Sequence, residues 1–182
     1  RYATAIEALQ KVAPSNSPKG EDSASAAVKS SPLGGNEGGQ LLEQYDQLLA
    51  DKAVNEQRQQ LLIKDEQALM PWGDFDPASV ERLVKAGYDI NFFACAPRLY
   101  KEEWESEYNA IVINQDKSKV YFITVTAPGT EISIEAEMCR LPQSSLGNVV
   151  AELEALKTGN AAIEQKIAAF AANHLADLKA AH

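Results

Sequence analysis

The chain has 182 residues, of which 26 are acidic and 17 are basic, so its formal net charge is −9. This balance argues against nucleic-acid binding and against docking on anionic lipid, because both surfaces attract basic patches. With 45% hydrophobic residues, the chain can still bury a core. No apolar run reaches the roughly 18–20 residues that span a bilayer, and no signal-peptide pattern opens the sequence. We therefore expect this stretch to be soluble.

The first 70 residues combine helical patterns with a segment of different composition. Apolar residues in 2–12 recur at helical spacing, and we expect residues 1–13 to form the start of an outgoing hairpin helix. In residues 14–39, 14 of 26 are Gly, Ser or Pro, which predicts a flexible insertion because little apolar surface can be buried there. Residues 40–70 are helix-forming again and should complete the outgoing helix. Their apolar stripe consists of Leu41, Tyr45, Leu48, Leu62 and Leu69.

The clearest pattern lies in the helix predicted over residues 144–182, which Ser144 or Ser145 can cap. Its seam positions alternate at intervals of three and four residues through four heptads, the spacing of a coiled coil. They are Leu146, Val149, Leu153, Leu156, Asn160, Ile163, Ile167 and Phe170, followed by His174.

The simplest partner for this seam is the helix at 40–70, running antiparallel to it. If Leu69 lies beside Leu146, then Asn160 falls opposite Asn55. Two buried amides at that level would fix the register of the hairpin at some cost in stability.

Residues 71–143, between the two helices, predict a small lobe of different texture. We expect strands over 90–95, 110–113, 120–125 and 132–138, with a short helix opened by Pro97 after the first strand. The last segment alternates apolar and polar residues, which suits a half-buried strand, although a helix remains possible. The predicted fold class is α+β. A small α/β lobe, with about four strands and two short helices, is inserted at the tip of a long antiparallel helical hairpin.

The turn that opens the lobe carries two carboxylates, Asp74 and Asp76. Two neighbouring carboxylates are the minimum for acid–base or metal chemistry. However, Asp76 precedes Pro77 and is the expected N-cap of a helix, while turn formation accounts for Asp74. That helix should end at Gly87 and turn three apolar side chains inward: Val80, Leu83 and Val84.

Cysteine and histidine offer little for catalysis or metal binding. Cys95 and Cys139 lie in apolar surroundings and are expected to be buried thiols of a reducing compartment. His174 lies on the seam and His182 ends the chain, so neither has a second ligand at zinc-binding spacing. We therefore expect no catalytic residue, no metal and no cofactor.

Three aromatic residues, Tyr100, Trp104 and Tyr108, align at intervals of four on the predicted short helix. Such a line usually covers a sheet, although large aromatics also anchor partner interfaces. The neighbouring Glu102 and Glu103 suit either a solvated face or a surface complementary to basic helices. These five residues are the candidate partner interface.

The turn Pro71-Trp72-Gly73-Asp74-Phe75-Asp76-Pro77 resembles subunit I of bacterial and archaeal V-type ATP synthases, the counterpart of eukaryotic vacuolar ATPase subunit a. The helix ending Lys85-Ala86-Gly87, the strand 90–95, and Leu141-Pro142 before a long helix share this resemblance, which covers about residues 40–182. It implies the distal cytoplasmic lobe with its flanking hairpin helices. The chain departs from the family in its long 14–39 segment and lacks the proximal lobe's opening strands and the membrane domain.

The resemblance implies a non-catalytic stator fragment on the cytoplasmic side of the cell membrane. It would dock the peripheral-stalk heterodimer and support ion transport coupled to ATP hydrolysis or synthesis, while the full-length protein would carry a membrane domain. Two alternatives remain open. One is a generic coiled-coil adaptor that self-associates, and the other is a ligand-binding or enzymatic α/β lobe, for which the sequence offers no cluster of titratable residues.

Overall fold

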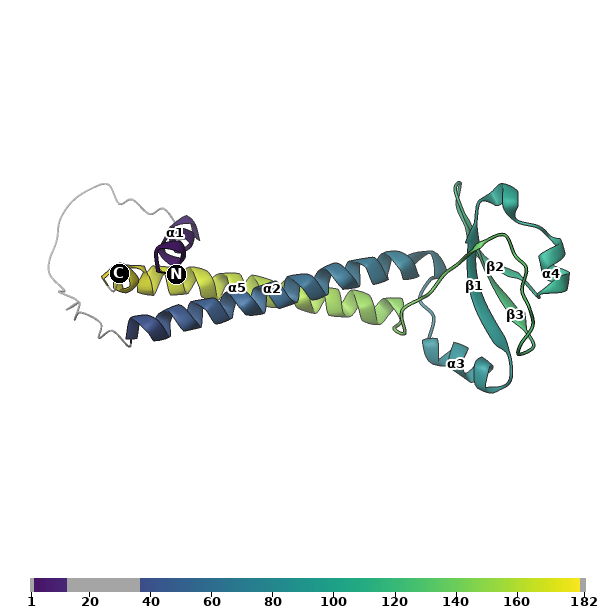
Figure 1. Ribbon diagram of the computed structural model, residues 1–182, viewed down its shortest axis with the longest axis horizontal. Helices are drawn as coiled ribbons and strands as arrows, with labels where there is room; N and C mark the ends of the chain where they lie inside the picture. The colour runs from purple at the N-terminus through teal and green to yellow at the C-terminus, as the bar shows by residue number, and fades with distance from the viewer. Residues whose placement is uncertain (1, 13–36, 181–182) are drawn as a thin grey trace. The chain divides into compact units, whose positions relative to one another are not determined.

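The computed structural model describes residues 2–12 and 37–180, which fall into two compact units (Figure 1). Unit 1 contains residues up to Gln59 and from Ala155 onward, and unit 2 contains Gln60–Glu154. Two long helices, α2 (Glu37–Leu69) and α5 (Leu146–Ala180), contribute to both units. Within the described residues, no helix combines the length and apolar character needed to cross a bilayer.

Unit 1 is built from three helices. The short helix α1 (Tyr2–Val12) packs against α2 and α5, and its Leu9 is fully buried. Tyr45 of α2 and Phe170 of α5 stack in the same cluster, with ring centroids 6.0 Å apart. The full set of buried residues is Ala5, Leu9, Leu42, Tyr45, Ile167, Phe170 and Ala171.

The position of α1 corrects the expectation that residues 1–13 start the outgoing helix. Thr4, Ala5 and Ala8 face Tyr45, Asp46 and Leu49 across a small cavity, so α1 lies alongside α2. α1 is amphipathic, and it buries its apolar stripe by packing side by side with α2 and α5. The predicted insertion at 14–39 lies outside the described residues except for its last three residues, which form the first turn of α2.

Burial along both long helices repeats at intervals of three and four residues. On α5, every predicted seam residue from Leu146 to His174 is buried or half-buried. On α2, the same spacing selects nine buried or half-buried positions: Leu41, Tyr45, Leu48, Lys52, Asn55, Gln59, Leu62, Glu66 and Leu69. Three consecutive members of this α2 series are polar.

Unit 2 contains a four-stranded antiparallel sheet, which confirms the mixed helix-and-sheet class. The strands are β1 (Asp89–Cys95), β2 (Ile111–Gln115), β3 (Val120–Thr126) and β4 (Glu137–Met138), in the order β2-β3-β1-β4. β2 and β3 form the predicted hairpin, and a β-bulge lies between Val112 and Asn114.

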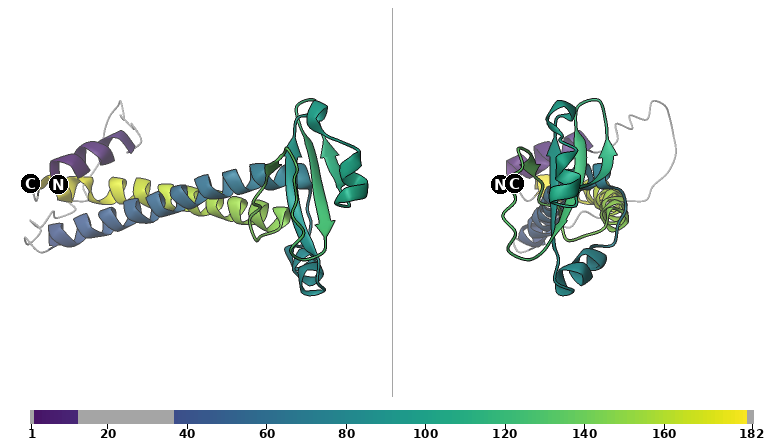
Figure 2. Two further views of the ribbon diagram at one scale, coloured as in Figure 1. Left: turned by 45° about the vertical axis from the view of Figure 1, so that its right-hand side comes forward. Right: turned by 90° about the vertical axis from the view of Figure 1, so that its right-hand side faces the viewer.

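The two faces of the sheet carry different aromatic clusters. On one face, Phe93 and Phe122 pack with Trp104 of the short helix α4 (Glu103–Glu107). On the other face, Trp72 of the 3-10 turn η1 (Met70–Trp72) meets Phe92 and Tyr121 edge-on. Figure 2 shows the sheet between α4 and the end of α2. Adjacent residues of each strand therefore supply two separate apolar layers.

Two predicted elements of the lobe are wrong in their form. The expected helix after Pro97 is a 3-10 turn, η2 (Pro97–Leu99), followed by α4. Of the expected strand 132–138, only Glu137 and Met138 pair with β1. Ile132, Ile134 and Ala136 pack on the aromatic cluster instead, so their alternation reflects side-chain burial without a hydrogen-bonded ladder.

Helix α3 (Pro77–Lys85) also differs from its prediction. Its Leu83 and Val84 are 46% and 49% exposed, although both were expected to point inward, and Val80 is half-buried. α3 is a short helix that packs on β1. Only the side of α3 that faces β1 can be buried in this contact. The apolar residues beyond that contact remain at the surface.

Candidate docking surfaces and polar sites

Both carboxylates of the opening turn cap helices. Asp76 Oδ1 accepts a hydrogen bond from the Ala78 backbone N–H at 3.0 Å, which confirms it as the N-cap of α3. Asp74 Oδ1 accepts one from the Gly147 N–H, also at 3.0 Å, in the first turn of α5. A Cβ atom on Gly147 would lie 3.0 Å from Asp74 Oδ2, so the glycine permits this close approach. The turn is thereby attached to the start of α5.

The aromatic residues of the candidate partner interface lie mainly in the interior. Trp104 and Tyr108 are only 4% and 7% exposed, and Tyr100 is half-buried. Trp104 stacks on Phe122 with ring centroids 5.6 Å apart, and Tyr100 meets the same ring edge-on at 5.2 Å. In this structure these three side chains pack the interior of unit 2 and present no exposed aromatic anchor.

The Tyr100 hydroxyl joins this aromatic cluster to the acidic surface beside it. It donates a hydrogen bond to Glu105 Oε1 at 3.0 Å. Burial, with this carboxylate as the second cause, raises the pKa of Tyr100 from 10.0 to about 12. Both causes favour the neutral phenol.

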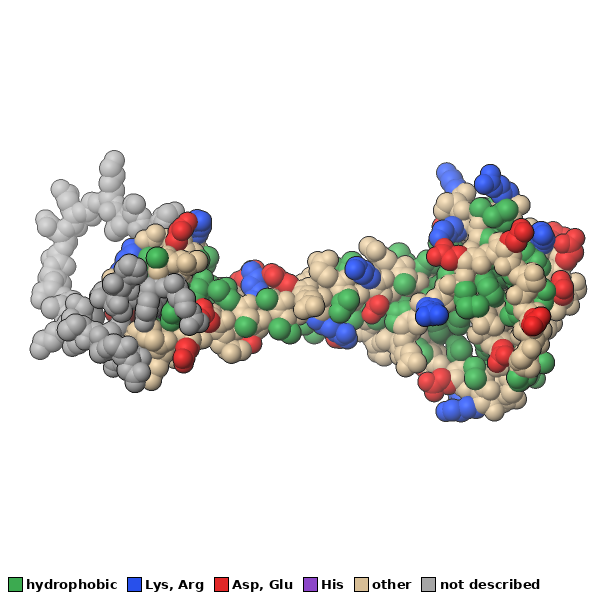
Figure 3. Space-filling model, in the orientation of Figure 1, with side chains coloured by type: hydrophobic (Ala, Val, Ile, Leu, Met, Phe, Trp, Pro, Cys, Tyr) green, Lys and Arg blue, Asp and Glu red, His purple; other side chains and the backbone are tan. Residues whose placement is uncertain are grey.

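Glu102 and Glu103 are exposed, together with Glu105 and Glu107. Figure 3 shows acidic side chains at the edge of unit 2 where Figure 1 draws α4. The structure thus separates the five candidate residues, because the aromatic members lie inside while the acidic members remain at the surface.

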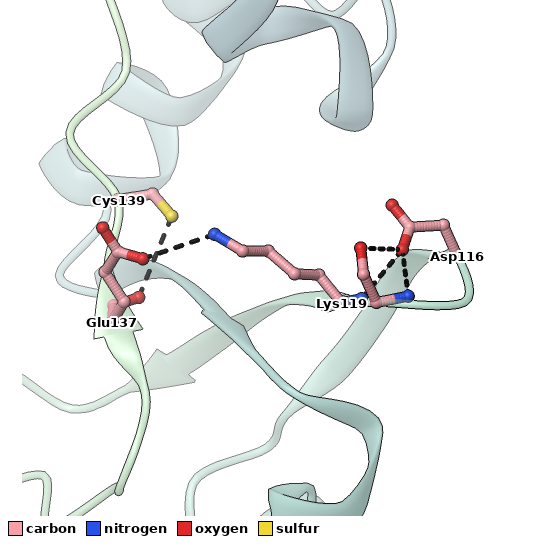
Figure 4. A network of polar contacts seen from close by, with 5 residues as sticks. Asp116, Lys119, Glu137 and Cys139 are labelled. Carbon is pink, nitrogen blue, oxygen red and sulfur yellow. Dashed lines mark hydrogen bonds and ion pairs between the residues drawn. The ribbon is translucent and has the colours of Figure 1, made fainter.

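A second polar cluster joins the β2–β3 turn to β4 (Figure 4). Asp116 Oδ1 accepts hydrogen bonds from the Ser118 hydroxyl and from the backbone N–H groups of Ser118 and Lys119, at 2.6–2.8 Å. These bonds, the Ser118 hydroxyl first, lower the pKa of Asp116. Lys119 Nζ then lies 3.5 Å from Glu137 Oε2. The Asp116 bonds close a tight turn, and Lys119 lies opposite the short edge strand, which itself pairs with β1.

The cysteines are both free thiols. Cys95 is buried on β1, and Cys139 is half-buried just after β4. Burial raises the pKa of both thiols, so the protonated, weakly nucleophilic form is favoured. In the described part of the chain, no group of three or more His, Cys, Asp or Glu side chains is arranged to hold a metal ion.

An apolar groove lies between α3 and the sheet, on the face opposite α4. It has a volume of about 270 Å³, and Asp76 and Ser79 supply the polar side chains of its lining. Two of its apolar residues, Leu83 and Ile113, are 46% and 44% exposed. Sequence reasoning missed this groove because the pattern of α3 predicted inward-facing side chains.

The seam residues of α5 lie in both units. Leu146, Val149 and Leu153 belong to unit 2, where Val149 is 1% exposed. Leu156, Asn160, Ile163, Ile167 and Phe170 belong to unit 1, and the last two are buried. His174 lies over Phe170, with ring centroids 4.9 Å apart, and its Nδ1 is 3.6 Å from Asp177 Oδ2.

The predicted partner of Asn160 is corrected by one helical turn. Asn160 Nδ2 donates to Gln59 Oε1 at 3.3 Å, whereas Asn55 lies next to Gly159. The nearby Lys52 Nζ forms an ion pair with Glu164 Oε1 at 2.8 Å. An amide pair between the helices is therefore present, but a side chain as long as glutamine reaches Asn160 from the adjacent seam position.

Comparison with known proteins assigns no family, since neither a family model nor a curated protein matches the chain.

Proposed function

We propose that this chain is a non-catalytic stator fragment of a rotary V-type ATP synthase or ATPase. In this proposal, α2 and α5 form an antiparallel coiled-coil hairpin, and unit 2 is the lobe that docks the peripheral-stalk heterodimer. The fragment would belong to the cytoplasmic side of a membrane-anchored subunit I.

The observation that carries the proposal is the burial pattern of α2 and α5. Both helices bury positions at alternating intervals of three and four residues, which is the spacing of a coiled-coil seam. In unit 1 the helices contact each other through Tyr45 with Phe170, Lys52 with Glu164, and Gln59 with Asn160. Along these three contacts the α2 residue number rises from 45 to 59, whereas the α5 residue number falls from 170 to 160. The two helices therefore run antiparallel. Long helices packed in this way resist bending, which is the property that a stator requires.

The turn that carries the family resemblance supports the same reading. Trp72 packs on the sheet, Asp74 caps α5 and Asp76 caps α3. The residues of this motif therefore act together to hold the end of α2, the start of α5 and the sheet of unit 2. A structural role of this kind accounts for the motif without any catalytic chemistry.

Two surfaces of unit 2 are available for the stalk in this proposal. The apolar groove beside Leu83 and Ile113 offers area for burial. The exposed carboxylates of Glu102 and Glu103 offer charge complementarity to basic helices.

Native mass spectrometry of the chain mixed with the peripheral-stalk heterodimer of the same organism tests the proposal. A 1:1:1 complex at micromolar concentration is expected, and its absence at low salt would contradict stalk docking. Reversing Glu102 and Glu103 to Lys should weaken the complex at low salt. Reversing Glu43 and Asp51, two exposed acids of α2 in unit 1, removes the same amount of negative charge away from both surfaces and provides the control.

The second candidate function is a coiled-coil adaptor that self-associates through the same seam. The exposed apolar side chains of α2, Val54 at 65% and Leu61 at 49%, favour this alternative because they could meet another helix. Light scattering separates the two functions, since the hairpin should be monomeric without the stalk and the adaptor dimeric.

A further inference from the structure

The contact between α2 and α5 changes character along unit 1. Close to α1, the side chains between the helices are apolar and well buried, including Tyr45, Ile167 and Phe170. The next two turns along α2 place polar side chains at the seam positions. We define the polar segment as Lys52, Asn55 and Gln59 of α2 with Gly159, Asn160 and Glu164 of α5.

The polar contacts of this segment are incomplete. Gln59 Oε1 accepts a hydrogen bond from Asn160 Nδ2 at 3.3 Å, which is long for such a bond. Asn160 Oδ1 is buried and has no hydrogen-bond partner. A buried acceptor that loses water without gaining a partner lowers stability, so this layer holds the helices together less firmly than apolar packing of the same length.

The ion pair beside the amides lies near the surface. Lys52 Nζ is 2.8 Å from Glu164 Oε1 and 3.7 Å from Glu56 Oε1, while both carboxylate side chains are more than half exposed. Exposed ion pairs contribute little to stability because water and salt screen them. The pair orients the helices without replacing the missing apolar contact.

Gly159 weakens α5 at the same level. The nearest heavy atom to a Cβ built on Gly159 is Asn55 Nδ2, at the ordinary contact distance of 3.9 Å. A methyl group would therefore fit, so close packing does not require glycine here. Glycine inside a helix gives the backbone more freedom in the open state and favours local opening.

We propose that the polar segment is a built-in joint of the helix pair, which opens locally while the apolar cluster beside α1 stays packed. The weak amide layer, the partly exposed ion pair and the helix-interior glycine all occur within two turns of each helix. Local opening at such a place requires breaking fewer apolar contacts than opening elsewhere. This inference does not depend on the ATPase assignment.

Native-state hydrogen exchange of the full chain, read by mass spectrometry, tests the joint. We expect amides of residues 156–164 to exchange at least about ten-fold faster than those of residues 166–171 of the same helix. Both stretches lie inside α5, well away from its ends, so end fraying does not account for a difference. Equal or slower exchange in residues 156–164 would overturn the proposal.

Two variants show whether the named side chains cause the opening. Gln59→Leu with Asn160→Leu should slow exchange in residues 156–164 and remove most of the difference. Gln57→Leu with Gln165→Leu also replaces two side-chain amides with leucine, but at exposed positions, and should leave the difference in place. If the first pair has no effect, or the second has the same effect, the polar layer is not the cause and the proposal fails.

Gly159→Ala tests the backbone part of the joint. It should slow exchange in the same stretch several-fold, because there is room for the methyl group and alanine favours the helix. The matched control is Gly39→Ala near the start of α2, where nothing lies within 4 Å of the new Cβ. That substitution should not change exchange in residues 156–164, and an unchanged rate in Gly159→Ala would contradict the role of the glycine.

Discussion

Asp74 caps a helix that begins more than seventy residues later, because its Oδ1 atom accepts the Gly147 N–H at 3.0 Å. The first N–H groups of a helix have no partner within the helix, so a carboxylate at this end can accept a hydrogen bond from one of them. Its negative charge also interacts favourably with the positive end of the helix dipole. Ser145 Oγ satisfies a neighbouring one by accepting the Asn148 N–H at 3.2 Å. The start of α5 is therefore fixed by one local cap and one distant cap.

Replacing Asp74 with Ala should lower the free energy of unfolding by about 1 kcal/mol, the usual cost of losing a cap. Urea denaturation followed by circular dichroism measures this change. Glu103→Ala is the control. Glu103 is an exposed acid of α4, a helix whose N-cap makes no side-chain hydrogen bond. A loss in Asp74→Ala no larger than in the control would contradict the capping role.

Trp104→Ala should destabilise the protein by about 3–5 kcal/mol, because the ring is buried in the aromatic cluster and its removal leaves a cavity. Glu103→Gln, at the exposed neighbour, should change stability by less than about 0.5 kcal/mol. Thermal or urea unfolding of both variants checks the pair. A small loss in Trp104→Ala would mean that the ring is not part of the packed interior.

Leu9→Ala should destabilise unit 1, since Leu9 has no exposed surface and packs in the apolar cluster that α1 forms with α2 and α5. The expected cost is about 2–5 kcal/mol. The matched control is Val12→Ala at a 45% exposed position of the same helix, where the cost should be well under 1 kcal/mol. Equal effects of the two substitutions would show that α1 does not occupy its site.

The pKa of Tyr100 predicts a loss of stability at high pH. Its value is about 12 in the folded protein against 10.0 ordinarily, so folding favours the protonated phenol. The resulting stabilisation is fully present below pH 10 and is lost as pH rises through about 12. Urea midpoints measured from pH 9 to 12 should fall, and Tyr100→Phe should reduce the fall.

Tyr88→Phe is the matched control for that experiment, because Tyr88 is 48% exposed. It should leave the pH dependence of the urea midpoint unchanged. If both variants, or neither, flatten the alkaline loss, the buried phenol of Tyr100 is not its source.

Elements with a strong local pattern were predictable from the sequence. The heptad spacing of α5, the helix-forming stretch of α2, the β2–β3 hairpin and the Asp76 cap of α3 each depend on residues close together in the chain. Hydrophobic periodicity and cap chemistry act over one or two turns, which is why these features are readable.

Features that depend on distant contacts were not predictable. Gly147 as the partner of Asp74 and Gln59 as the partner of Asn160 follow from packing between segments far apart in sequence. The segment containing Ile132 and Ile134 alternates like a strand but buries its side chains without pairing. Periodicity reports which side chains are buried, and it does not report which backbone groups are paired.

The central claim is that α2 and α5 of one chain pair with each other. Cross-linking Lys52 to Glu164 tests this claim most directly. Their 2.8 Å separation allows a zero-length carbodiimide to join the amine and the carboxylate by an amide bond. In an equal mixture of ¹⁴N- and ¹⁵N-labelled chains, the cross-linked peptides should be entirely light or entirely heavy. A substantial fraction of mixed-isotope peptides would show that the helices pair between chains, and would contradict a helical hairpin formed within a single chain.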